Sequence, residues 1–136
     1  MARVVVVLMG TMALLVGADS VANAQVEFNP IDWSVVTTII GRDGEDLPLR
    51  TGQHDAPNSE GFGIRHIEDG HNGFIPDPGL IQLAVESVSS NPNPNSTSTV
   101  TYVDANGRKF FVAWTERVDS RSPDGRPVGI ITAFYP

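Results

Sequence analysis

The chain has 136 residues, a formal net charge of −7 and no cysteine. Without cysteine, a disulfide framework, a cysteine-based zinc site and a thiol nucleophile are excluded. The acidity argues against high-affinity binding of duplex nucleic acid, which draws much of its affinity from cations, but it leaves room for a site that engages one or two phosphates.

Residues 1–24 have the pattern of a secretory signal peptide. Arg3 supplies a positive start, the apolar run VVVVLMGTMALLVG follows, and Ala22-Asn23-Ala24 is a small-residue cleavage site. Because the run is shorter than the roughly 20 residues that span a bilayer, we expect cleavage of the leader and no stable membrane insertion. The sequence thus predicts a secreted protein whose mature part, residues 25–136, is a single small domain.

The charge of this mature part is unevenly distributed. Counted along the printed sequence, residues 25–99 hold 3 basic and 11 acidic side chains, whereas residues 100–136 hold 5 basic and 4 acidic ones. We therefore expect any phosphate site to lie beside the C-terminal part.

The first half of the mature part gives no single answer on secondary structure. In residues 31–40, IDWSVVTTII, the apolar residues are too continuous to show either a helical or a strand period. Residues 41–63 are rich in Gly, Asp, Asn and Pro, which favours a long irregular connection. This connection leads into GIRHIEDGH, residues 63–71, which holds two of the three histidines of the chain.

A helix is predicted to begin at Pro78. Asp77 can cap it, and proline suits the first helical position. The apolar residues that follow recur at helical spacing and predict one buried stripe, which is made of Leu80, Ile81, Ala84, Val85 and Val88. The segment NPNPNSTS then ends the helix.

The C-terminal part is predicted to form strands. Residues 98–103, 109–117 and 128–135 are rich in β-branched and aromatic side chains, and Asn106-Gly107 is a hairpin signal between the first two. In the middle strand, alternation places Phe110, Val112 and Trp114 on one face. The economical arrangement is an α+β fold, in which N-terminal helical segments pack on a C-terminal antiparallel sheet of three to four strands.

His66 and His71 lie five positions apart and are the leading candidates for chemistry. A neutral imidazole can take the proton from a ribose 2′-hydroxyl while a protonated one gives a proton to the leaving 5′-oxygen. The alternative is a zinc site that includes His54 and the intervening carboxylates, although the spacing matches no standard zinc pattern. Solvated or structural histidines are the third interpretation.

Two motifs indicate a family. The ending GIITAFYP, together with RHIEDGH upstream of a helix, resembles the barnase–EndoU–colicin–RelE-like group of small bacterial ribonucleases, and more narrowly its EndoU-like and phage or polymorphic-toxin branches. The resemblance covers residues 61–136. It implies a helical part with the histidines, an antiparallel sheet, and RNA cleavage that needs no metal or cofactor and leaves 2′,3′-cyclic phosphate.

The resemblance also assigns residues. His66 and His71 would be the acid–base pair, and Thr132 and Tyr135 would position the substrate or stabilise its phosphate. The basic residue of the family has no single equivalent here, and the candidates for substrate binding are Arg65, Lys109, Thr115 and Arg117. The partners implied are an RNA substrate and, for a toxin, a neutralising immunity protein.

This sequence departs from the family in two ways. Its histidines are closer together, and Thr132 and Tyr135 are three apart instead of two. In a regular strand an odd separation places side chains on opposite faces, so one site could use both only with a bulge or a twist at the strand end. Otherwise Thr132 together with Thr115, or Tyr102 in place of Tyr135, would form the polar side of the site.

A different class of function stays open. An exported binding module without catalytic activity, or a degenerate member of the same fold, would explain the low number of cations. In that case Arg65 would simply pair with Glu68 or Asp69, Lys109 would be a solubilising edge charge, and Thr132 an ordinary strand residue. His54 is expected to be an exposed bystander.

Overall fold

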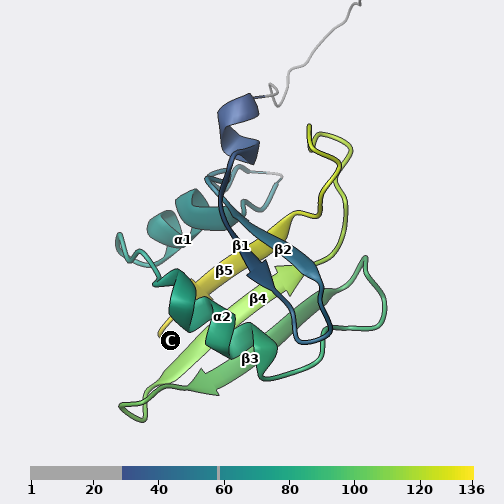
Figure 1. Cartoon of the computed structure of the whole chain (residues 1–136). Coiled ribbons are helices and arrows are strands. Elements are labelled where there is room, and N and C mark those ends of the chain that lie inside the picture. Colours follow the sequence, from purple (N-terminus) through teal and green to yellow (C-terminus); the bar gives the residue numbers. More distant parts are fainter. Residues whose placement is uncertain (1–28, 58) are drawn as a thin grey trace, which may run out of the picture.

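The computed structural model describes residues 29–57 and 59–136 (Figure 1). The predicted signal peptide lies outside these residues. Within them, none of the helices is long and apolar enough to cross a membrane.

The described part contains two α-helices and five strands, all paired antiparallel, so the predicted α+β class is confirmed. A short 3₁₀ helix (Pro30–Trp33) precedes them. In chain order the elements are β1 (Val35–Ile40), β2 (Asp46–Arg50), α1 (Gly63–Gly70), α2 (Pro78–Glu86), β3 (Thr97–Val103), β4 (Lys109–Thr115) and β5 (Gly129–Phe134).

The C-terminal half follows its local signals closely. Strands β3, β4 and β5 form a three-stranded sheet in chain order, and the Asp104–Arg108 turn with Gly107 at φ 78° connects the first two. Helix α2 begins where predicted, because the Asp77 side chain accepts a hydrogen bond of 3.0 Å from the Gly79 N–H. These elements could be predicted because each depends on residues that are neighbours in sequence.

The N-terminal half differs from the expectation of helical segments. Residues 31–40 divide into the 3₁₀ helix and β1, and β1 pairs with β2 in a separate two-stranded sheet. The prediction of an irregular connection over residues 41–63 is wrong for β2, whose Leu47 and Leu49 are buried in the core. Pro48 disguised this strand, but β2 has only one strand neighbour, and an edge strand tolerates proline.

The main core lies between α2 and the three-stranded sheet (Figure 1). Phe110, Val112 and Trp114 of β4 are fully buried there, which confirms the predicted core face of this strand. The other face of the sheet, turned away from α2 and called the far face below, carries the alternate residues Phe111, Ala113 and Thr115. Helix α1 lies beside β5 (Figure 1).

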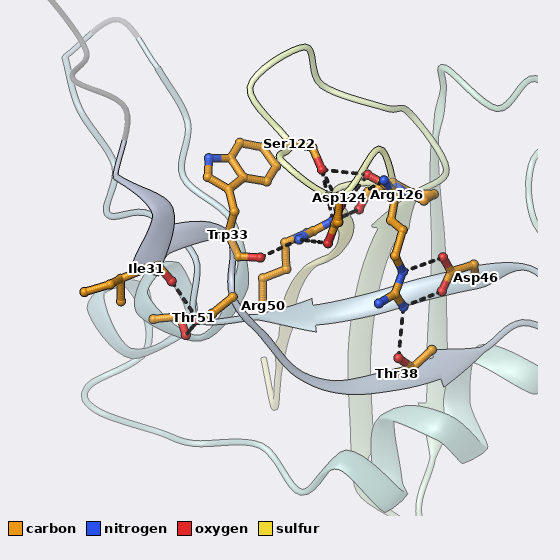
Figure 2. A network of polar contacts seen from close by, with 11 residues as sticks. Ile31, Trp33, Thr38, Asp46, Arg50, Thr51, Ser122, Asp124 and Arg126 are labelled. Atoms are coloured by element: carbon orange, nitrogen blue, oxygen red, sulfur yellow. Dashed lines mark hydrogen bonds and ion pairs between the residues drawn. The ribbon is translucent and has the colours of Figure 1, made fainter.

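A fully buried arginine joins the two halves of the chain (Figure 2). Arg50, the last residue of β2, donates two hydrogen bonds of 3.0 Å to the Asp124 carboxylate, and others to the carbonyls of Trp33 and Pro127. Trp33 is buried beside it and anchors the N-terminal segment. The loop between β4 and β5 is therefore held against β2, and Arg50 holds the pKa of Asp124 well below its usual range.

Replacing Arg50 should destabilise the fold strongly. We expect Arg50→Met to lower the free energy of unfolding by about 3–5 kcal/mol, because Asp124 and several carbonyls lose their donors. Arg126→Met, which breaks the partly exposed pair with Asp46, should cost at most about 1 kcal/mol. Urea unfolding measures both, and equal effects of the two substitutions would contradict the role assigned to Arg50.

Candidate functional site

Glycine allows the segment that starts α1 to lie directly against the end of β2. Gly63 has φ +74°, and a Cβ there would lie 2.6 Å from the Arg50 carbonyl oxygen. A Cβ on Gly61 would lie 2.1 Å from the carbonyl oxygen of Gln53, which pairs with Phe62 in an isolated bridge. Residues 61–63, called the strap below, therefore set where α1 begins.

Helix α1 carries one histidine and ends at the other. His66 lies inside the helix and His71 is its C-terminal cap. The helix forms because Ile64 and Ile67, three positions apart, share a face that packs on the core, with Ile67 fully buried. This packing fixes the orientation of His66 and the exit of the chain at His71.

His71 lies on β5. Its ring stacks on Phe134 with centroids 3.8 Å apart and planes inclined by 13°. Its Nε2 is 3.5 Å from the Thr132 hydroxyl oxygen, at the outer limit of a hydrogen bond. The structure thus brings together two of the four predicted catalytic residues.

A β-bulge determines which residues of β5 share a face. Ala113 pairs with Thr132 and Trp114 with Ile130, so Ile131 is the extra residue. The bulge places Thr132 and Phe134 on the far face. It precedes Thr132 and so does not bring in Tyr135.

Tyr135 lies on the side of the sheet that faces the core. It packs against Phe110, and its hydroxyl donates a hydrogen bond of 2.8 Å to Asp104. Because Asp104 accepts this bond, the pKa of Tyr135 is raised. The structure therefore separates Tyr135 from Thr132. Tyr102, the alternative wall residue, packs against the same core.

An aspartate orients His66. The Nδ1 of His66 and the Oδ1 of Asp55 are 2.9 Å apart, and the His66 side chain is only 12% exposed. The same Asp55 oxygen accepts a hydrogen bond of 2.6 Å from the Gly61 N–H. That N–H first, and His66 second, lower the pKa of Asp55. Nothing in the sequence indicated this partner, which precedes His66 by 11 positions.

The two histidines have different electrostatic environments. Burial of the ring lowers the pKa of His71 below its ordinary value of 6.5, and the charge that His66 can carry lowers it further. His71 is therefore neutral near pH 7. His66 faces a carboxylate instead. The two imidazoles thus have unlike surroundings.

The predicted cations have three different placements. Arg65 forms an ion pair with Asp32, so the expected pairing with Glu68 or Asp69 is wrong. Lys109 is exposed at the start of β4, and strand alternation places it on the far face beyond Phe111. Arg117 follows the other end of β4, and 46% of its side chain is exposed. Lys109 and Arg117 thus lie toward opposite ends of β4, whose Ala113 pairs with Thr132.

The remaining predicted residues have structural partners. Thr115 is buried, and its hydroxyl donates to the Ser96 carbonyl at 3.0 Å and accepts from the Arg117 N–H at 3.1 Å. It therefore positions Arg117. His54 is 60% exposed, as expected, and pairs with Asp69. No group of three or more potential metal-ligating side chains occurs within residues 29–57 and 59–136.

Comparison of the chain with protein-family models, curated proteins and solved structures found no match. The family resemblance seen in the sequence therefore stays a prediction. What the chain does has to be inferred from the geometry of its own residues.

Replacing Gly63 should lower the free energy of unfolding by more than a difference in helix propensity can explain. We expect Gly63→Ala to cost more than about 2 kcal/mol, because a left-handed backbone and a contact with the Arg50 carbonyl are both unfavourable. Gly70→Ala, in open space at the end of the same helix, should stabilise by about 0.5–1 kcal/mol. Thermal or urea unfolding gives the sign, and a tolerated Gly63→Ala would contradict the close approach.

The ring proton signals of His71 should titrate at a pH below the ordinary histidine value of about 6.5. In His66→Gln the midpoint should rise only part of the way, because burial is the larger cause. NMR spectroscopy of the imidazole C–H signals measures both midpoints. A His71 midpoint at or above that of a free histidine would contradict the described environment.

Proposed function

We propose that this protein is a secreted, metal-independent endoribonuclease of the EndoU-like group. The observation that carries the proposal is the contact of His71 with Thr132 on the far face, with His66 on the helix that His71 caps and oriented by Asp55. Two imidazoles in unlike environments beside a hydroxyl can move protons on either side of a phosphodiester. Helices α1 and α2 correspond to the helical part that the resemblance implies.

The environments assign the roles. Neutral His71 takes the proton from the ribose 2′-hydroxyl, and the 2′-oxygen then forms a bond to phosphorus. As the bond from phosphorus to the 5′-oxygen breaks, protonated His66 gives its proton to that oxygen. The products are a 2′,3′-cyclic phosphate and a 5′-hydroxyl. Asp55 holds the His66 ring through Nδ1, and Nε2 stays available for the leaving group.

The negative charge that builds on the phosphate oxygens needs nearby donors. The Thr132 hydroxyl is within the site, and Lys109 and Arg117 at the two ends of β4 are the candidate cations. Each phosphate contact adds affinity and needs a cation of the protein. Because the protein has few cations, it engages a short single-stranded RNA through one or two phosphates. A toxin of this kind would need a neutralising immunity protein.

A second candidate function is an exported binding module without catalytic activity. Two observations favour it: the net charge of −7 and the placement of Tyr135 on the core side, bonded to Asp104. It predicts that the histidines can be replaced without loss of binding.

The deciding experiment incubates the purified protein with an end-labelled RNA oligonucleotide in excess EDTA. We expect cleavage with cyclic phosphate ends, and a loss of about 10²–10⁴-fold in rate for His66→Ala and for His71→Ala. His54→Ala is the matched control and should keep its activity, because His54 is exposed and lies on the Asp69 side of α1. Unchanged cleavage in both site variants would remove the acid–base assignment, and a requirement for Zn²⁺ would favour the metal alternative.

A further inference from the structure

A cavity of about 170 Å³ lies beside the histidine site. The strap, the ends of β3 and β4, the turn that follows β4 and the bulge residue of β5 form its walls. The residues that line it are Glu60, Gly61, Phe62, Thr97, Thr115, Arg117, Asp119, Arg121, Val128 and Ile131.

Two structural links join this cavity to the histidine site. Ile131, in its wall, directly precedes Thr132, and the bulge turns both toward the far face. On the opposite side, the N–H of Gly61 bonds to the Asp55 oxygen that orients His66. The cavity therefore adjoins Thr132 through Ile131 and the partner of His66 through Gly61.

The walls combine an apolar surface with free polar groups. Phe62 and Val128 are apolar, and Trp33 supports Phe62 with ring centroids 4.8 Å apart. Asp119 is fully engaged, since it accepts from the Arg117 and Arg121 guanidinium groups. The two guanidinium planes remain partly exposed.

Two further wall groups are available to a ligand. The Glu60 carboxylate forms no ion pair with another described residue. The Thr97 side chain, at the start of β3, is exposed.

We propose that this cavity binds one nucleobase of the RNA strand, belonging to a nucleotide next to the cleaved phosphate. The proposal rests on the function proposed above and adds a subsite to it. A base can stack on the partly exposed guanidinium plane of Arg117 or Arg121, and its polar edge can meet Glu60 and Thr97. The volume of the cavity is below the roughly 300 Å³ at which ligand pockets begin, so the cavity is limited to one base.

The test titrates the protein with the four nucleoside 3′-monophosphates and follows backbone amide signals by NMR. Ribose 5-phosphate is the probe without a base. We expect shifts at Thr97, Arg117 and Arg121 with at least one nucleotide and not with ribose 5-phosphate. No shifts at these residues, or equal shifts with both kinds of probe, would overturn the proposal.

A matched pair of variants on β3 sharpens the test. Thr97→Trp fills the cavity and should weaken nucleotide binding by about tenfold or more, the equivalent of one lost stacking contact. Thr101→Trp is the control, because Thr101 is exposed on the same side of β3 but pairs with Phe111, away from the cavity. Equal affinities of the two variants would contradict a base in this cavity.

The two proposals can fail separately. Nucleotide shifts at the cavity without any RNA cleavage would reject the ribonuclease and keep the subsite. Cleavage that depends on His66 and His71, without shifts at the cavity, would reject the subsite and keep the ribonuclease.

Discussion

The buried guanidinium of Arg50 connects the parts of the chain that carry the site. It bonds to the Trp33 carbonyl on the N-terminal side and to the Asp124 carboxylate in the loop before β5. The carbonyl of the same residue lies against Gly63, where α1 begins. A buried charge is tolerated only where such partners are in place. The relative positions of α1 and β5, and with them of the histidines and Thr132, therefore depend on this one side chain.

The second constraint is the bulge at Ile131. It places Thr132 and Phe134 on the far face, where His71 stacks, and leaves Tyr135 facing the core. The site is consequently made of one hydroxyl and two imidazoles. Burial lowers the pKa of the His71 imidazole, whereas the His66 imidazole bonds to the Asp55 carboxylate, so two identical side chains have different surroundings.

The negative net charge of the chain is compatible with a proposed site for phosphate, because the charges close to the site act most strongly on a bound anion. Two carboxylates near the site are already bonded: Asp55 to His66 and Asp119 to two arginines. An overall negative field still disfavours the binding of long polyanions.

The sequence by itself determined the elements that depend on neighbouring residues: the helix capped by Asp77, the Asn106-Gly107 hairpin and the core face of β4. The family resemblance grouped His66, His71, Thr132 and Tyr135, of which the structure brings His71 against Thr132 and places Tyr135 on the other face. Only the tertiary structure decided that the segment containing Pro48 is a strand, that Asp55 is the partner of His66, and which face Tyr135 occupies. The reason is physical. Capping, turns and alternation act over a few residues, whereas a bulge or an ion pair is set by the register of segments that are distant in the chain.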